Sequence, residues 1–274
     1  MKITLHNNGW TVIIDEDLRT LTQEEIFEVC KLIVKNTVVV FRNQTLTEQD
    51  ELKFCKTIGG VQPTRFEHTK NLSLSNGILR VTGKKNEQGE PGLFGHKAVL
   101  DWHCNSPGAK TRHPIIWLYG VEGTSGSKTS WINNALAYND LPEDFKKEIN
   151  NIEIFCGYET GKFSDSDFFR QGINYANPLK LVYTNIAGET GLFFPFLQIF
   201  GFKDKSEDYF NSVMKRLTEH ILQEKYMYHH DWQDGDVVIA EQWLGIHKRW
   251  PFEGMGERIL HRIAFNYYEV FHSQ

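Results

Sequence analysis

Two of the eleven histidines stand in surroundings that could hold a metal ion. His103 lies in "DWHCNSPG", where one spacer residue separates it from the small polar side chain of Asn105. His247 lies far along the chain in "AEQWLGIHKRWPF", just past an apolar run that reads as a strand. Neutral imidazole is a common ligand of transition metals, and a nearby oxygen donor would add a third bond. The alternative is two loops that each contain an ordinary histidine.

A pair of arginines follows His247 in a segment that predicts a strand. Arg258 comes eleven residues after His247, and Arg262 comes four residues later. An even spacing places two side chains on the same face of a strand. Two inward arginines are unusual in a core, because a buried guanidinium needs an anionic partner. They indicate either structural salt bridges at a sheet edge or a bound carboxylate, which a bidentate guanidinium recognises well.

The elements that must position these residues are mostly short strands with irregular connections. Apolar segments bounded by turn residues predict strands over 114–122, 128–133, 152–159, 180–185, 236–242 and 259–269. Helices are expected near 142–150 and 205–222. This pattern favours a mainly β chain with α elements, built as a double-stranded β-helix (jelly roll) core with flanking helices.

The N-terminal part of the chain predicts a helix, a buried strand and a second helix that pack as one unit. Each helix begins at a threonine that is followed three residues later by an acidic residue, which is the pattern of a capping box. These elements are expected over 22–36, 37–43 and 47–60, with Thr22 and Thr47 as the capping residues.

Length and composition are those of an ordinary globular chain. The 274 residues are 40% hydrophobic and 24% charged, and no clear boundary divides them, so we expect a single domain over 1–274. The net charge of -5 and the lack of a basic block argue against nucleic-acid binding. No apolar run suits a signal peptide or a membrane span, and the four cysteines form no C-x-x-C pair. We therefore expect a cytoplasmic protein with reduced thiols and no membrane partner, and leave a homo-oligomer open.

Four segments, in order along the chain, carry a resemblance to a known family. They are "TVVVFRNQTLTEQDELKFCKTIGG", "WHCNSPG", "GTSGSKTSWINNALAYNDLP" and "HKRWPFEGMGERILHR". Together they resemble the iron(II)/2-oxoglutarate dioxygenases, and specifically the taurine dioxygenase-like (TauD/TfdA) branch. The first segment is similar to the N-terminal unit of that family, the second to its metal loop, and the fourth to its second metal histidine and arginine strand. One such motif alone would be weak, whereas four in the right order are strong.

The resemblance implies an oxidoreductase that uses Fe(II), 2-oxoglutarate and O₂. Such an enzyme couples the oxidative decarboxylation of 2-oxoglutarate to hydroxylation of a C–H bond in a small-molecule substrate. His103 and His247 would be the two imidazole ligands of the iron, and Asn105 stands where the family has a carboxylate ligand. A facial set of three protein ligands leaves three positions open on the metal for the co-substrate and O₂.

The resemblance also implies roles for three residues around the metal. Thr129 and Arg258 would hold the distal carboxylate of 2-oxoglutarate, and Arg262 would lie near the substrate end, where it could meet an anionic group. Trp131 and Tyr138 are expected in the core rather than in catalysis. The expected substrate is a small polar molecule, anionic or amino-acid-like, and a protein or nucleic-acid substrate does not suit the net charge.

Asn105 is the departure from the family pattern, and four interpretations are open. Its amide oxygen could be a neutral ligand of an oxygenase, or the position could be left to an anion such as chloride, as in related iron halogenases. The asparagine could instead be an Asp→Asn change introduced to block turnover, or it could mark a non-catalytic jelly-roll binding protein. Two acids lie nearby along the chain, Asp101 and Glu241, and neither is expected to replace the missing ligand.

Overall fold

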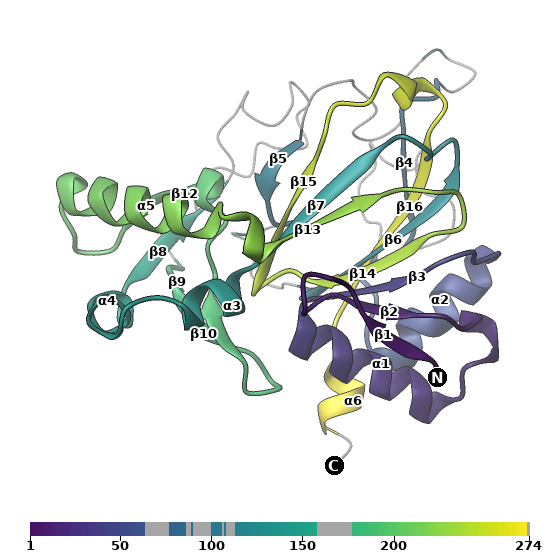
Figure 1. Cartoon of the computed structure of the whole chain (residues 1–274), viewed down its shortest axis with the longest axis horizontal. Coiled ribbons are helices and arrows are strands. Elements are labelled where there is room, and N and C mark those ends of the chain that lie inside the picture. The colour runs from purple at the N-terminus through teal and green to yellow at the C-terminus, as the bar shows by residue number, and fades with distance from the viewer. Residues whose placement is uncertain are drawn as a thin grey trace.

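The computed structural model describes residues 1–63, 77–85, 89, 100–105, 107, 113–157 and 177–272. Most of the segment just before the metal loop lies outside these residues, as does the end of the strand predicted over 152–159. The described chain is mainly β with several helices, as the sequence predicts (Figure 1).

The N-terminal unit has the predicted order of helix, strand and helix. The side chain of Thr22 accepts from Glu25 N while the Glu25 carboxylate accepts from Thr22 N, and Thr47 and Asp50 repeat this exchange. Both capping boxes are therefore confirmed, and each satisfies backbone N–H groups that a helix start would otherwise leave open. The elements are α1 (Gln23–Asn36), β3 (Val38–Phe41) and α2 (Glu48–Ile58).

Two sheets form the main body of the molecule (Figure 1). Every strand pair in them is antiparallel except the pair of β2 with β3. The larger sheet has the order β1 (Ile3–Leu5), β2 (Val12–Ile14), β3, β14 (Val237–Glu241), β6 (Ile115–Glu122), β16 (Ile259–Phe265) and β4 (Leu79–Thr82). The smaller sheet has the order β13 (Met227–Asp231), β7 (Lys128–Asn133), β15 (Gly245–Arg249) and β5 (Leu100–His103).

The core is arranged in layers on either side of the larger sheet, and β6 shows how. Ile116 and Leu118 point to a buried cluster shared with Trp131 of the smaller sheet, whereas Ile115 and Trp117 point to a second cluster. This alternation is the two-residue period of a strand buried on both faces. The second cluster packs α1, α2 and the C-terminal α6 (Tyr268–His272) against the outer face of the sheet.

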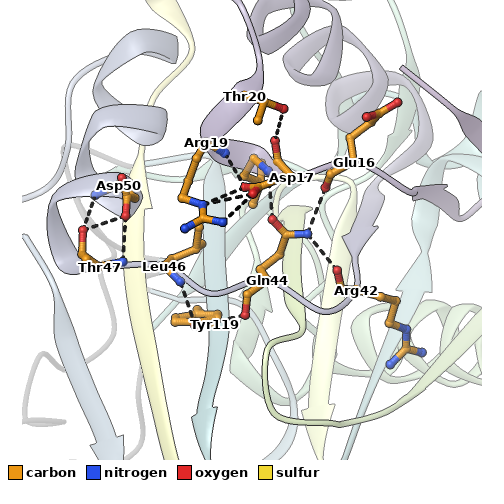
Figure 2. Close-up of polar contacts among 11 residues, drawn as sticks. Glu16, Asp17, Arg19, Thr20, Arg42, Gln44, Leu46, Thr47, Asp50 and Tyr119 are labelled. Carbon is orange, nitrogen blue, oxygen red and sulfur yellow. Dashed lines mark hydrogen bonds and ion pairs between the residues drawn. The ribbon is translucent and has the colours of Figure 1, made fainter.

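A buried glutamine ties the N-terminal loops together, as Figure 2 shows. Gln44 Oε1 accepts from Leu18 N over 2.9 Å, and its Nε2 donates to the carbonyl groups of Glu16 and Arg42. Nearby, Leu46 N donates to the hydroxyl of Tyr119 in β6. The entry to α2 is thereby fixed to the sheet that also carries the arginine strand β16.

The remaining elements gather at one end of the two sheets (Figure 1). The helices predicted near 142–150 and 205–222 are confirmed, whereas the strand predicted over 180–185 is divided between two small sheets. The helices are α3 (Asn134–Asn139), α4 (Glu143–Ile149) and α5 (Glu207–Ile221). The strands are β8 (Glu153–Cys156), β9 (Leu179–Lys180), β10 (Val182–Thr184), β11 (Thr190–Leu192) and β12 (Ile199–Phe202).

Two further features of the described chain concern its cysteines and the length of its apolar helices. The four cysteines are buried and form no disulfide. Within the described ranges, no helix is both long enough and apolar enough to cross a membrane.

Candidate iron and 2-oxoglutarate site

His103 and His247 occupy directly opposite positions on neighbouring strands of the smaller sheet. His103 is the last residue of β5 and pairs with His247 in β15, and the centroids of the two imidazole rings lie 4.2 Å apart. The sequence placed each histidine beside a strand, whereas the structure places both inside short strands. Neither strand contains the run of β-branched residues by which a strand is recognised in a sequence, which explains the difference.

Both imidazoles are neutral and His103 has a defined tautomer. Its Nδ1 donates to the carbonyl oxygen of Asp101 over 2.6 Å, since a carbonyl can only accept, so the ring proton is on Nδ1 and the lone pair is on Nε2. Burial, helped by the nearby Arg249 and Arg262, lowers the pKa of His103 to about 4, although the bond to Asp101 opposes the shift. Burial also holds the pKa of His247 well below its usual range. Neutral imidazole is the form that binds a metal.

Two buried glutamines hold the short loop that carries Asn105. Gln198 brackets Cys104: its Oε1 accepts from Cys104 N over 2.9 Å, and its Nε2 donates to Cys104 O over 3.1 Å. Gln242 Oε1 accepts from both the backbone N and the side-chain Nδ2 of Asn105, over 2.9 and 3.0 Å. The sequence gives no local signal for either glutamine, because they lie 94 and 137 residues from the loop.

The two nearby acids make contacts that lead away from the histidines. The Asp101 carboxylate lies 2.9 Å from Lys248 Nζ, and its side chain is about half exposed. The Glu241 Oε2 accepts from the backbone N of Trp243 and of Leu244, so it closes the turn between β14 and β15. Among the described residues, no cluster of three or more His, Cys, Asp or Glu side chains could hold a metal ion. The amide oxygen of Asn105 is therefore the remaining candidate for the third ligand.

A single cavity brings together every residue that the sequence singled out for the site. Thr129 and Arg258 are only 3% and 2% exposed, and Arg262 is half buried. Arg258 precedes the first residue of β16, yet it lines the same cavity as Arg262, as the even spacing predicts. The polar residues that line the cavity are His103, Asn105, Thr129, His247, Arg249, Arg258 and Arg262.

Arg249 is a buried residue of the site that sequence reasoning missed. It pairs with Thr129 across β15 and β7, and its side chain lines the cavity. A signal for it was present, because an even spacing from His247 places both on one face of a strand. Burial lowers the pKa of Arg249 to about 10. The pKa of Arg258 is lowered to about 9 by burial and, to a lesser extent, by the charge of Arg249. Both side chains remain cationic at neutral pH and favour an anionic ligand.

The second histidine is backed by a large aromatic side chain. Trp131 is fully buried, and its ring stacks on His247 with centroids 6.4 Å apart and an angle of 25° between the planes. Trp131 is thus a core residue, as expected. Tyr138 lies in α3, partly buried against the cluster at the end of the sheets.

The donor set fits Fe(II). Two neutral imidazoles on adjacent strands and one hard oxygen donor match the nitrogen and oxygen ligands that this metal takes in facial sites. The set differs from the usual one in charge, because the amide of Asn105 is neutral where a carboxylate would carry one negative charge.

The comparisons with known proteins show which class of protein this fold and cavity belong to. The family model described as "Taurine catabolism dioxygenase TauD, TfdA family" matches residues 8–264. Because this match spans most of the chain, the protein belongs to the TauD/TfdA family. It is accordingly an oxidoreductase of the class that uses Fe(II) and 2-oxoglutarate.

Three relatives show the extent of the similarity. The alpha-ketoglutarate-dependent 2,4-dichlorophenoxyacetate dioxygenase of Burkholderia sp. (strain RASC) is 24% identical over 88% of this chain and 86% of its own. The (S)-phenoxypropionate/alpha-ketoglutarate-dioxygenase of Sphingobium herbicidovorans is 22% identical, over 81% and 79%. The crystal structure of AAD-2 in complex with Mn(II) and N-oxalylglycine superposes with a TM-score of 0.77 at 20% identity, covering 96% of each chain. This last likeness concerns the fold.

Proposed function

We propose that this protein binds Fe(II) through His103, Asn105 and His247 and hydroxylates a C–H bond of a small, polar, anionic substrate. The observation that carries the proposal is the direct pairing of the two histidines on one cavity with Asn105. The two facing sheets around that cavity are interpreted as a double-stranded β-helix within a single domain.

The co-substrate is assigned to the end of the cavity that holds Thr129 and Arg258. When bound, iron supplies the O₂ activation that couples loss of CO₂ from 2-oxoglutarate to oxidation of the substrate. Arg258 offers a planar pair of N–H donors for the distal carboxylate, and Thr129 offers a hydroxyl. Arg249 adds a second positive charge beside them, which favours a dianionic co-substrate.

The substrate is assigned to the side of Arg262, which orients an anionic group so that the target C–H bond faces the metal. Two relatives, named for 2,4-dichlorophenoxyacetate and for (S)-phenoxypropionate, act by their names on carboxylates, which agrees with a cationic substrate contact. The other side chains that line the cavity are apolar and limit the access of water to the reacting centre. They comprise Val81, Leu100, Ile116, Leu118 and Leu260.

The alternatives to hydroxylation make different demands on Asn105. A halogenase with an open anion position requires its amide to leave the metal. A non-catalytic binding protein requires no metal, and its ligand affinity would survive loss of either histidine. The buried pairing of two neutral imidazoles favours a metal-dependent function, because such a pair offers two lone pairs to one ion.

An anaerobic titration with Fe(II) and 2-oxoglutarate tests the proposal through the visible charge-transfer band of the chelate. We expect the band at stoichiometric iron, and succinate formation that depends on iron, 2-oxoglutarate and O₂. His247→Ala should abolish both, while His229→Ala, on β13 of the same sheet but outside the cavity, should retain them. A band that shifts with added chloride would favour the halogenase. Ligand binding that persists in His103→Ala and His247→Ala would favour the binding protein.

A further inference from the structure

The hydrogen bonds around Gln242 form a chain in which each donor and acceptor is fixed by the one before. Gln242 Nε2 lies 2.6 Å from the carbonyl oxygen of His113, which can only accept, so the amide nitrogen must stand there. Gln242 Oε1 then faces the backbone N–H of Asn105 over 2.9 Å, which can only donate. Both ends of the Gln242 amide are thus defined by backbone groups, which have no alternative orientation.

This polarity extends to the side chain of Asn105. Its amide lies 3.0 Å from the same Oε1 of Gln242, and only an N–H can meet an acceptor that is already fixed. Nδ2 is therefore held by Gln242, and Oδ1 is the atom left on the other side of the amide. Within the part of the chain that the structure describes, Asn105 Oδ1 accepts no hydrogen bond, and Asn105 lines the cavity with both histidines.

We propose that Gln242 is a positioning residue that turns the amide oxygen of Asn105, and not its nitrogen, toward the metal between His103 and His247. An amide nitrogen has no lone pair to offer, so an asparagine that flips freely would be a ligand in only one of its two orientations. Partners outside the ligand set commonly fix the orientation of ligating side chains in this way. The inference rests on the proposed function, because it concerns one of the proposed ligands.

Gln242 is itself rigidly placed. Its side chain is 4% exposed, and its backbone N donates to the carbonyl oxygen of Pro114 over 2.8 Å. It directly follows the last residue of β14, a central strand of the larger sheet. This anchoring also opposes displacement of the Asn105 amide from the metal. If the amide swung away, the buried Oε1 of Gln242 would lose the hydrogen bond from Asn105 Nδ2.

The pairing suits asparagine better than aspartate at position 105. A carboxylate has no N–H for Gln242 Oε1, so two acceptors would face each other at the 3.0 Å contact. Rotation of the Gln242 amide would not relieve this, because it would oppose Nε2 to the backbone N–H of Asn105 and Oε1 to the carbonyl of His113. The surroundings of position 105 are therefore built for an amide.

The test is a double-mutant cycle in which Co(II) alone is the probe. The dissociation constant of Co(II) is measured by calorimetry for the wild type, Gln242→Met, Asn105→Ala and the double variant, and the visible d–d spectrum is recorded for each. We expect Gln242→Met to weaken Co(II) binding about tenfold or more when Asn105 is present. In the Asn105→Ala background the same change should alter the affinity less than about twofold, because the amide through which it acts is gone.

Gln198→Met is the matched control. Gln198 holds the backbone of the neighbouring Cys104 through two hydrogen bonds but has no bond to the Asn105 side chain. Any loss of Co(II) affinity that it causes by loosening the loop should be equal with and without Asn105→Ala. The d–d spectrum of Gln242→Met should move toward that of Asn105→Ala, and the spectrum of Gln198→Met should not.

The outcomes separate the inference from the proposed function. Equal losses from Gln242→Met in both backgrounds would overturn the positioning role while leaving the metal site intact. Absence of Co(II) binding in the wild type, or binding that survives His247→Ala, would overturn the proposed function and this inference with it. If Gln242→Met does not fold, Gln242→Ala removes the same acceptor and takes its place in the cycle, and equal losses of Co(II) affinity with and without Asn105→Ala would refute the inference.

Discussion

The indole of Trp232 donates its Nε1–H to the hydroxyl oxygen of Thr129 over 2.9 Å, in the buried layer between the two sheets. Because an indole N–H can only donate, Thr129 Oγ1 must accept there, and its own proton is left to be directed elsewhere. Thr129 lines the cavity, so this proton is available to a carboxylate bound beside Arg258. Trp232 thereby makes Thr129 a donor toward the proposed co-substrate.

Removing the Thr129 hydroxyl and removing the Trp232 indole should weaken 2-oxoglutarate binding to different extents. Thr129→Val deletes the hydroxyl without changing the shape, and we expect a loss of about 1.5–3 kcal/mol, the usual value of a hydrogen bond to a charged group. Trp232→Phe only releases the hydroxyl, and we expect about 0.5–1.5 kcal/mol. The dissociation constant of 2-oxoglutarate in the presence of Fe(II), measured anaerobically, gives both values.

Trp10→Phe is the control for loss of an indole from the same layer. Trp10 belongs to the cluster that contains Trp232, and its Nε1 forms no hydrogen bond within the described residues. It should leave the affinity for 2-oxoglutarate unchanged. Equal affinities in Thr129→Val and the wild type would contradict the role given to the hydroxyl.

Arg258 should contribute more to co-substrate binding than any other side chain. Arg258→Ala is expected to weaken 2-oxoglutarate binding by about 2–4 kcal/mol, because a buried carboxylate loses its charged partner. Arg258→Lys keeps the charge but not the planar pair of donors, so its loss should be intermediate. The same anaerobic titration measures both variants, and an unchanged affinity in Arg258→Ala would remove Arg258 from the site.

The sequence predicted the residues of the site better than it predicted the strands that carry them. The residue types and their order along the chain were enough to single out His103, His247 and Arg258, which all line one cavity. The short strands β5 and β15 were missed, since they have only four and five residues and neither contains a run of β-branched residues. Their strand conformation comes from pairing with neighbours that are distant in sequence, which no local pattern reports.

The contacts that orient the site residues could not be predicted at all. Gln198, Gln242 and Trp232 act through hydrogen bonds to residues about 100 positions away or more, and each is an ordinary residue type in its local sequence. The capping boxes of α1 and α2 were predictable for the opposite reason, since donor and acceptor lie within four consecutive residues.

Gly123 should be required for the correct placement of Arg258. Gly123 has a φ of +63°, and a Cβ at this position would lie 2.9 Å from the carbonyl oxygen of Glu257, which directly precedes Arg258. Gly123→Ala must therefore displace that segment, and we expect both a lower thermal midpoint and weaker 2-oxoglutarate binding.

Gly188→Ala separates the two effects of the change at Gly123. Gly188 has a φ of +84°, but a Cβ there would meet no atom within 4 Å. Its substitution should cost about 1–3 kcal/mol of stability from backbone strain and leave 2-oxoglutarate affinity as in the wild type. If Gly123→Ala behaves in the same way, the contact with Glu257 does not control Arg258.

A buried histidine outside the metal site should make the stability of the protein depend on pH. His230 is fully buried in β13, where its Nδ1 lies 2.9 Å from the Tyr228 hydroxyl and its Nε2 lies 3.1 Å from Asp236 Oδ2. Arg42 also contacts the Asp236 carboxylate. Burial lowers the pKa of His230, and Arg42 lowers it further, while Asp236 and Asp231 oppose the shift.

The sign of the dependence follows from the lowered pKa of His230. Between the folded pKa and the unfolded value near 6.5, the unfolded chain binds more protons, so acidification favours unfolding. The stability due to neutral His230 is complete above about pH 6.5 and is lost as the pH falls toward the folded pKa. Urea unfolding of the metal-free protein at pH 7.5 and 5.5 should show a smaller difference between the two values in His230→Gln than in the wild type. Tyr228→Phe keeps the imidazole, so it should lower the free energy of unfolding at both pH values without reducing the difference between them. A smaller difference in Tyr228→Phe would mean that a group other than His230 titrates.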